Sequence, residues 1–205
     1  AESSGHIYYN FGDFMVENVK LKVIETHEEI LDVIDKNIGT LVNFDWHSDF
    51  PMYPDTIFDA DAYSNMALKN YDTWKDNNWV PILVSRGYIC KYIFMYPHDC
   101  GKDEIKKFKA KKGDCELYSI KFQNQARIPY KYITIDADFF GTRVPFNWSP
   151  EDRMGLFIDV FESLTARNVT MIIAKSGHYV NYNVEEFLED IINEMSNRAN
   201  VEEVL

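Results

Sequence analysis

The sequence is short of the features that identify several large classes of protein. It has 205 residues but no run of eighteen or more apolar residues, so no membrane-spanning helix is expected. Residues 1–5 lack the basic and then apolar pattern of a secretory signal. We therefore expect a soluble, cytoplasmic protein without a membrane partner.

Cysteine and glycine are also scarce. The three cysteines, Cys90, Cys100 and Cys115, are odd in number and have no C-x-x-C spacing, which argues against a disulfide framework and a zinc knuckle. We interpret them as ordinary reduced thiols. The nine glycines form no G-x-G-x-x-G or G-x-x-x-x-G-K-[ST] motif, so no phosphate-binding loop of these kinds is predicted.

Positive charge is outnumbered by negative charge. The chain has 21 Lys and Arg against 33 Asp and Glu, and its formal net charge is -12. A polyphosphate partner needs clusters of cations, so nucleic acid is not expected, and the basic run at 106–112 is interpreted as a solvated helix face. The acidic balance fits a cationic ligand or metal ions, although acidity that serves solubility alone explains it equally well. The oligomeric state is left open.

Short apolar runs alternate with amphipathic stretches along the chain. The pattern predicts strands over 19–24, 40–44, 88–95, 116–122, 132–135 and 169–174, and helices over 27–36, 63–74, 103–111, 150–167 and 184–196. Thr26 and Glu29 have the spacing of a capping box, and Ser149 followed by Pro150 is typical of a helix start. Strands separated by helices indicate an α/β protein with a mainly parallel sheet, and the length fits one domain over 1–205.

Two clusters of metal-ligand side chains follow two of these strands. The run at 40–44 ends on Asp45, in the pentapeptide DWHSD that also contains His47 and Asp49, and the run at 132–135 leads into Asp136 and then Asp138. The carboxyl ends of parallel strands share one crevice, and strand alternation points every second side chain the same way. We therefore expect these five side chains to meet at one site.

Such a set exceeds what a single tetrahedral zinc ion needs. Four of the five groups are carboxylates, which suit Mn²⁺ or Mg²⁺ better than zinc, so two metal ions are predicted. Either motif alone is more simply explained by loop acids or a helix cap. Together they favour a metal site, because buried unpaired carboxylates are costly unless a cation compensates them.

The two motifs resemble those of the arginase and histone deacetylase superfamily. DWHSD resembles its D-A-H-x-D motif, and DAD at 136–138 resembles its D-x-D motif. The superfamily also places a ligand histidine at a helix start some twenty residues before the first motif, where this chain has His27; alone, His27 would be interpreted as a surface histidine. The resemblance spans His27 to Asp138 and implies a compact three-layer sandwich around a mainly parallel sheet.

The same resemblance implies a ligand set for two manganese ions. One ion would be held by His27, Asp45, Asp49 and Asp136, and the other by Asp45, His47, Asp136 and Asp138. Deacetylases of the superfamily use a single zinc ion held by two aspartates and a histidine. The additional acids Asp49 and Asp138 point to the binuclear, arginase-like branch, in which water activated by two ions attacks a guanidinium carbon.

Two further residues are candidates for catalysis and substrate binding. His178 follows the strand predicted at 169–174 and suits proton donation to the leaving amine, although a loop histidine without a role is equally consistent and His98 competes. Arginases also place a carboxylate near the substrate guanidinium shortly after the D-x-D motif. Glu151, or Asp152, approximately matches that position, where a carboxylate in the first helical turn also favours stability.

The chain departs from typical arginases in ways that bear on substrate. It is shorter, and it lacks both the His-Gly pair soon after the first motif and the Asn- and Ser-rich loop that grips free arginine. The short form, with THEE at 26–29 and DWHSD at 45–49, resembles the peptide arginases, which convert arginine residues of peptides to ornithine and urea. The aromatic residues, 15% of the chain, could line a peptide groove but are also ordinary core residues. We predict a metal-dependent C–N hydrolase with an arginine-containing peptide as substrate. The alternatives are hydrolysis of another guanidino compound or an acylated amine, and a non-catalytic metal-binding relative.

Overall fold

The computed structural model describes residues 15–50, 58–69, 79–97, 105–110, 113–141 and 148–204. Within them, the strands are β1 (Asn18–Ile24), β2 (Gly39–Phe44), β3 (Phe58–Asp59), β4 (Ile89–Tyr96), β5 (Ile105–Lys109), β6 (Cys115–Lys121), β7 (Tyr132–Asp136), β8 (Asn168–Ala174) and β9 (Asn200–Glu203). The helices are α1 (Ile30–Val33), α2 (Ala60–Lys69), α3 (Val80–Ser85), α4 (Pro150–Ser163) and α5 (Val184–Ser196), with 3₁₀ turns η1 (His27–Glu29) and η2 (Ala137–Phe140).

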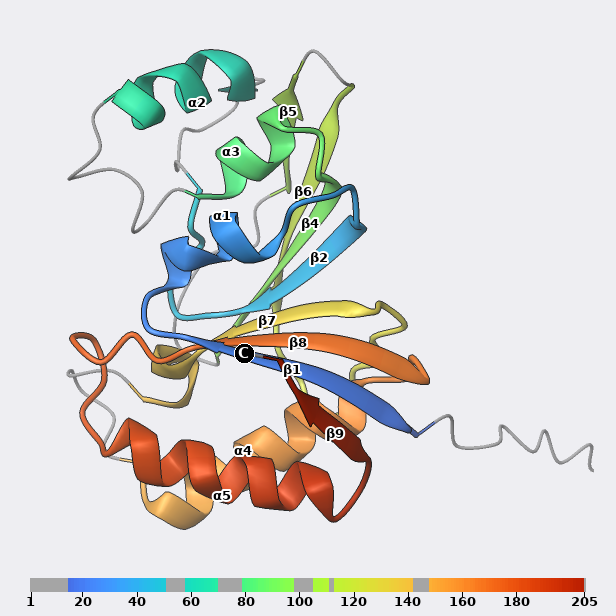
Figure 1. Cartoon of the computed structure of the whole chain (residues 1–205), viewed down its shortest axis with the longest axis vertical. Coiled ribbons are helices and arrows are strands. Elements are labelled where there is room, and N and C mark those ends of the chain that lie inside the picture. Colours follow the sequence, from blue (N-terminus) through green and yellow to red (C-terminus); the bar gives the residue numbers. More distant parts are fainter. Residues whose placement is uncertain are drawn as a thin grey trace, which may run out of the picture.

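These strands form one sheet in the order β3-β5-β6-β4-β2-β7-β8-β1-β9 (Figure 1). The seven strands from β6 to β9 are parallel, and β5 runs antiparallel to β6. From β2 the chain continues through β3 to β4, both on one side of β2, whereas from β7 it continues through α4 to β8 on the other side. The winding therefore reverses between β2 and β7, and a crevice forms at the carboxyl ends of strands at such a reversal.

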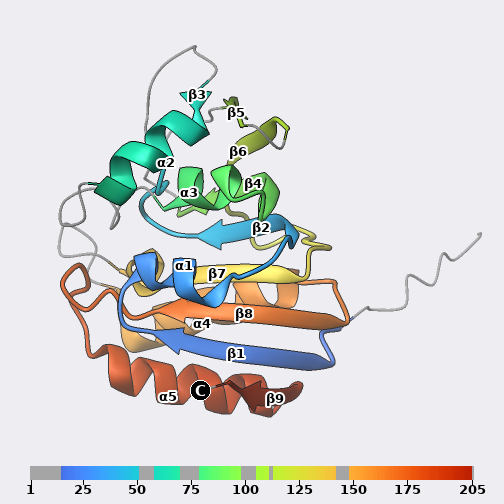
Figure 2. The same ribbon diagram turned by 45° about the horizontal axis from the view of Figure 1, so that its top comes forward.

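Helices cover both faces of the sheet. Figures 1 and 2 show α1, α2 and α3 on one face and α4 and α5 on the other. Two clusters of buried residues match these layers: one contains Ile30 of α1 and Leu83 of α3, and the other contains Phe157 of α4 and Ile191 of α5. The predicted α/β fold, a compact three-layer sandwich with a mainly parallel sheet, is confirmed.

The two strands at the reversal are buried along most of their length. The last four residues of β2, in GTLVNF, and of β7, in YITID, are all buried. Continuous burial is typical of parallel strands with helices on both sides, because neither face meets water. It also means that Asn43 and Thr134, the polar residues inside these strands, need hydrogen-bond partners.

Most predicted elements are present. The six predicted strands match β1, β2, β4, β6, β7 and β8 with ends that differ by no more than one residue, and α5 has the predicted bounds. Both predicted helix starts are confirmed, with capping boxes formed by Thr26 and Glu29 and by Ser149 and Asp152. Both helices end earlier than predicted, at Val33 and Ser163, because the next residue is already extended.

Some predictions are wrong or incomplete. The helix predicted over 103–111 is wrong: Ile105–Lys109 is the strand β5, in which Phe108 pairs with Cys115 of β6. Pairing with β6 overrides the local preference of a lysine-rich segment for helix. The helix predicted over 63–74 begins earlier, at Ala60, and 70–74 lie outside the described residues. The short apolar α3 and the polar edge strand β9 were not predicted. None of the described helices has the length and apolar character that a membrane span requires.

Candidate metal centre

The ends of three strands supply the predicted metal ligands. Asp45 directly follows β2, and Asp136 is the last residue of β7, so both lie where the winding of the sheet reverses. His27 lies in η1, just after β1. The other predicted ligands, which follow Asp45 and Asp136 along the chain, are His47, Asp49 and Asp138.

Four of the six residues surround one imidazole nitrogen. Nδ1 of His27 lies 3.0 Å from Oδ2 of Asp45, 3.0 Å from Oδ2 of Asp49 and 3.2 Å from Oδ2 of Asp136. All four side chains are buried, and this Nδ1 has no hydrogen-bond partner. We call these four residues the buried group. A buried nitrogen without a partner, facing three carboxylate oxygens, is an arrangement that a cation would complete.

A second group adjoins the first. Nδ1 of His47 lies 2.8 Å from Oδ2 of Asp138 and 3.9 Å from Oδ1 of Asp45. The side chain of His47 is 48% exposed, whereas both aspartates are buried. Backbone N–H groups fix the two carboxylates, since His47 donates to Oδ1 of Asp45 at 2.7 Å and Trp46 donates to Oδ1 of Asp138 at 3.1 Å. We call His47, Asp45 and Asp138 the outer group.

Asp45 belongs to both groups and presents a different oxygen to each. In each of the sets His27, Asp45, Asp136 and Asp45, His47, Asp138, one ligand atom per residue lies within 4.8 Å of the others. These buried aspartates and histidines could therefore hold metal ions. Asp136 was also expected to bridge two ions. Its Oδ1 accepts a hydrogen bond from the backbone N–H of Asp138 at 2.9 Å, as Oδ1 of Asp45 does from that of His47, so the bridging role of Asp136 stays a prediction.

The side chains converge by turns and not by strand alternation. After Asp45 the chain leaves β2, and Asp49 has a left-handed backbone with a φ of 53°. Asp138 lies in η2, whose N-terminal cap is Asp136. Strand alternation thus predicted the right neighbours for the wrong reason, because the backbone of each motif leaves the extended conformation after its first aspartate.

Polar residues inside the two central strands support two of the ligands. Oγ1 of Thr134 lies 2.8 Å from Nε2 of His27, and Nδ2 of Asn43 donates to Oδ2 of Asp45 at 3.1 Å. Sequence reasoning missed both residues. A signal existed, because each stands two positions before the terminal aspartate of an otherwise apolar strand, on the same face as that aspartate.

Two further supports come from distant parts of the chain. The hydroxyl of Ser176, just after β8, donates to Oδ2 of Asp136 at 2.6 Å. The indole N–H of Trp79, just before α3, donates to Oδ2 of Asp49 at 2.8 Å. No local sequence pattern marks either residue as a partner of these acids, since only the tertiary fold brings them together.

Burial and mutual repulsion dominate the electrostatics of the cluster. Burial raises the pKa of Asp45 and Asp138 well above the ordinary carboxyl value, and neighbouring carboxylates raise it further. Burial also raises the pKa of Asp49. Burial alone would raise the pKa of Asp136, but its contact with His27 and the charge of that imidazole help to lower this pKa below the ordinary value. A cation would favour the ionised form of every carboxylate here.

The imidazoles respond to the same acids. Burial lowers the pKa of His27, but its contacts with Asp136, Asp45 and Asp49 raise it well above the ordinary value. The contact with Asp138 raises the pKa of His47. The same carboxylates therefore favour the protonated form of both imidazoles.

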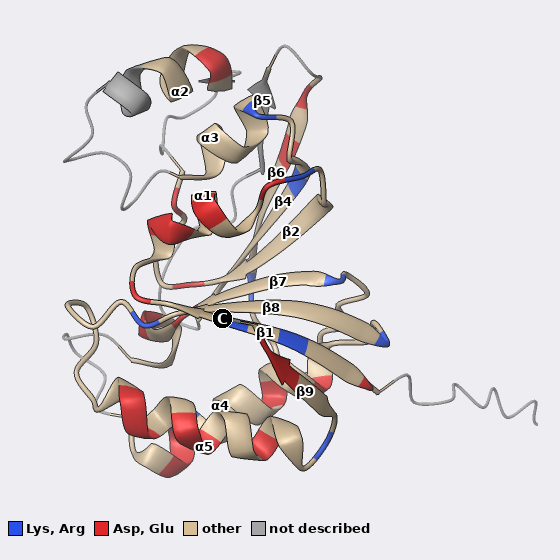
Figure 3. Ribbon diagram, viewed as in Figure 1, with Lys and Arg blue, Asp and Glu red and all other residues tan. Residues whose placement is uncertain are grey.

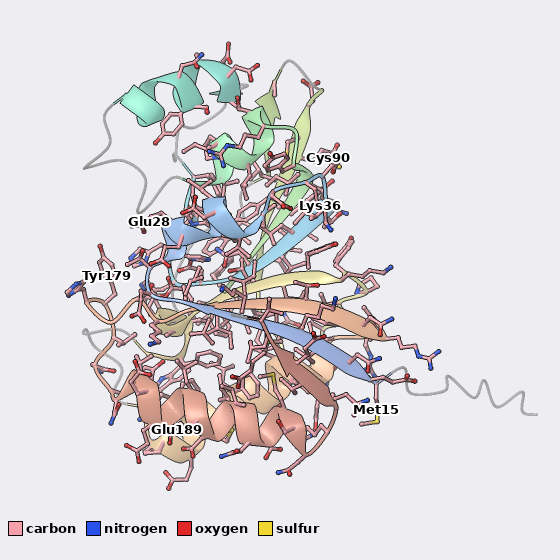
Figure 4. The ribbon with its side chains drawn as sticks, in the orientation of Figure 1. Met15, Glu28, Lys36, Cys90, Tyr179 and Glu189 are labelled. Carbon is pink, nitrogen blue, oxygen red and sulfur yellow. The ribbon has the colours of Figure 1, made fainter. Side chains whose placement is uncertain are left out.

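A cavity of about 350 Å³ opens onto the cluster. Its lining includes ligands from both groups, Glu28 of η1 and the exposed turn that contains His178 and Tyr179. Figure 4 shows Glu28 and Tyr179 at one end of the strands, opposite Lys36 and Cys90. The structure thus brings His178, the predicted proton donor, to the wall of the cavity that contains the candidate ligands.

Glu151 is not brought to this cavity. It lies in the first turn of α4, where it is exposed and lines a different cavity of about 770 Å³ together with Trp148 and Phe122. Asp152, its sequence alternative, forms the capping box of α4 with Ser149. The predicted substrate-binding position is therefore separate from the candidate metal ligands. His98 lies outside the described residues.

The fold and the site define an α/β protein with a candidate two-part metal centre at the reversal point of its sheet. No protein-family model matches the chain, and no curated protein matches it. Membership of the arginase and deacetylase superfamily therefore stays a prediction from the motifs.

Proposed function

We propose that this protein is a manganese-dependent hydrolase that cleaves the guanidino group of arginine residues in a peptide, giving ornithine and urea. The observation that carries the proposal is the position of Asp45, which turns one carboxylate oxygen to each of two ligand groups. A shared carboxylate is what a two-ion site requires, and a set of four aspartates and two histidines suits Mn²⁺.

The residues would divide between the two ions as the two groups do. His27, Asp49 and Asp136 would hold one ion, His47 and Asp138 the other, and Asp45 both. When bound, the ions would supply a water molecule activated for attack on an electron-poor carbon. The partnerless Nδ1 of His27 and the raised pKa values of the buried acids fit this loading, because a cation would satisfy both.

The proposed reaction needs a proton donor. Water adds to the guanidino carbon, the bond from that carbon to Nε breaks, and urea leaves while the side chain becomes an amine. Nε must gain a proton as this bond breaks. Among the described residues, His178 is the one histidine outside the two groups, and it lines the cavity. It takes the donor role in the proposal.

The size and charge of the cavity favour one cationic side chain presented on a longer chain. Small-molecule sites occupy about 300–1,000 Å³, so this cavity is at the small end of the range. Figure 3 draws acidic residues on α1 and at the carboxyl ends of the central strands, and basic residues at the opposite ends of β7 and β8. An acidic cavity attracts a guanidinium group, and in the proposal Tyr179, which is 46% exposed and lines the cavity, would contact the peptide.

Incubation with Mn²⁺ and arginine-containing peptides tests the proposal directly. We expect each processed arginine to lose one CH₂N₂ unit, detected by mass spectrometry, with an equal amount of urea released. Peptides in which lysine replaces arginine should be unchanged. Unchanged masses across peptides of varied sequence, with protein that has bound Mn²⁺, would refute the activity.

Parallel assays separate the alternatives. Urea from free guanidino compounds but not from peptides would indicate a small-molecule substrate, and acetate from acetylated lysine would indicate deacetylation. Metal uptake without turnover of any of these would indicate a binding protein. Asp45→Asn should abolish turnover, whereas Asp32→Asn, on the exposed side of α1, is the matched control and should retain it.

A further inference from the structure

A fully buried tryptophan contacts the buried group from outside. Trp79 directly precedes α3, and its indole Nε1–H donates to Oδ2 of Asp49 at 2.8 Å. The backbone N–H of Val80 donates to the carbonyl oxygen of Asp49 at 3.3 Å. The start of α3 therefore holds Asp49 by its side chain and by its backbone.

Asp49 requires such support because of its conformation. Its φ of 53° is in the left-handed region, which is unfavourable for residues other than glycine, although aspartate tolerates it better than most. Oδ2 of Asp49 accepts the indole hydrogen bond and also lies 3.0 Å from Nδ1 of His27. The hydrogen bond thus fixes the oxygen that faces the centre of the buried group.

The ring of Trp79 also restrains His27. The two ring centroids are 4.8 Å apart with an interplanar angle of 50°, and Nε2 of His27 is held by Thr134. An indole N–H is a donor only, so Trp79 cannot bind a metal ion itself. Its contacts orient two members of the buried group without competing with them for a cation.

The outer group is held differently. Its imidazole, His47, is 48% exposed, and the edge-on neighbour of that ring, Tyr179 at 5.9 Å, is itself 46% exposed. An exposed side chain keeps more rotamer freedom and must be ordered when an ion binds. The two halves of the centre therefore differ in how far their ligands are fixed in advance.

We propose that Trp79 is a positioning residue that makes the buried group the higher-affinity half of the metal centre. The first equivalent of Mn²⁺ then binds at His27 and Asp49, and the second binds at His47 and Asp138. This inference rests on the proposed metal centre. Removing a hydrogen-bond partner of a metal ligand commonly costs about 10- to 100-fold in affinity, which sets the expected effect of losing the indole.

Calorimetric titration of metal-free protein with MnCl₂ tests the proposal. We expect two binding steps in the wild type and, in Trp79→Phe, a first step weakened about 10- to 100-fold with the second step unchanged. Phe157→Leu is the matched control, because Phe157 is equally buried but belongs to α4 and packs in the other cluster of core residues. It should lower the melting temperature and leave both steps intact. Wild-type affinity at both steps in Trp79→Phe would overturn the proposal.

A second measurement does not need Trp79→Phe, so it holds even if that variant fails to fold. The indole N–H resonance of Trp79 is assigned by replacing the other three tryptophans one at a time, and it is followed by NMR during titration with diamagnetic Mg²⁺. It should shift within the first equivalent. A resonance that stays in place while ions bind would contradict the role of Trp79, whereas a wild type that takes up no ion would refute the proposed metal centre.

Discussion

The hydroxyl of Ser176 donates a hydrogen bond to Oδ2 of Asp136 at 2.6 Å, which joins the turn after β8 to the end of β7. Ser176 is buried and has a left-handed backbone, with a φ of 46°. A strained residue held beside a candidate ligand is typical of functional sites. Because the same turn continues to His178 and Tyr179, this hydrogen bond also anchors one wall of the cavity.

Ser176→Ala should therefore weaken the metal centre. We expect Mn²⁺ affinity to fall about 10-fold, because Asp136 loses a donor that fixes its carboxylate. Alanine removes the hydroxyl but keeps the unfavourable φ, whereas glycine removes the hydroxyl and adopts this φ without strain. Ser176→Gly therefore shows the effect of losing the hydroxyl in the absence of backbone strain. Calorimetric titration of both variants should show the same weakening. Full affinity in Ser176→Gly would mean that the hydroxyl has no part in metal binding.

Asp45→Asn should abolish binding of both ions, whereas Asp138→Asn should affect the outer group alone. The reason is that Asp45 faces both imidazoles and Asp138 faces only His47. Metal content after gel filtration gives the stoichiometry, with a loss of affinity of at least about 100-fold expected for Asp45→Asn. The substitution should not lower the melting temperature of metal-free protein, because it removes a buried negative charge. Equal metal content in the two variants would show that Asp45 is not shared.

The stabilising effect of Mn²⁺ should increase with pH. The pKa values of Asp45, Asp49 and Asp138 are raised above the ordinary value of 3.8 in the folded chain, so their protonated forms favour folding of metal-free protein. This contribution is fully present below pH 3.8 and is lost as pH rises through the raised pKa values. Metal ions bind the deprotonated acids. They therefore stabilise the folded chain mainly at the higher pH values, where protonated carboxyl groups no longer stabilise it.

Melting temperatures measured with and without Mn²⁺ test whether the stabilising effect of the ion increases with pH. The increase in melting temperature on adding Mn²⁺ should be larger at about pH 7.5 than at about pH 5.5, because fewer protons compete with the ion at the higher pH. The raised pKa of His27 acts in the same direction, since its proton also occupies the centre. An increase that is independent of pH would argue against binding at these carboxylates.

His178→Asn should lower kcat by about 10²- to 10⁴-fold while Mn²⁺ uptake stays the same, because His178 belongs to neither ligand group. Peptide turnover and metal content measured on one preparation separate these effects. Glu151→Gln provides a comparison at the position that the sequence favoured for substrate binding. Since Glu151 lines a separate cavity, we expect KM to change by less than about twofold, and a large rise in KM would restore its predicted role.

The central part of the fold was predictable because its signals are local. Apolar runs mark β2 and β7, and the polar residues after them mark the strand ends that form the crevice. The helix predicted over 103–111 failed for the opposite reason: its lysines favour helix locally, and only pairing of Phe108 with Cys115 across β5 and β6 shows that the segment is a strand.

The sequence by itself determined the alternating α/β pattern, the capping boxes at Thr26 and Ser149 and the identity of the candidate ligands, because these depend on periodicity and on the chemistry of individual side chains. Only the tertiary structure decided which carboxylate faces both imidazoles, that Ser176 and Trp79 support the ligands, and that Glu151 lies elsewhere. Those relations depend on the left-handed turn at Asp49, on the 3₁₀ turn after Asp136 and on strands distant in sequence that pair in space, and no local pattern in the chain encodes such contacts.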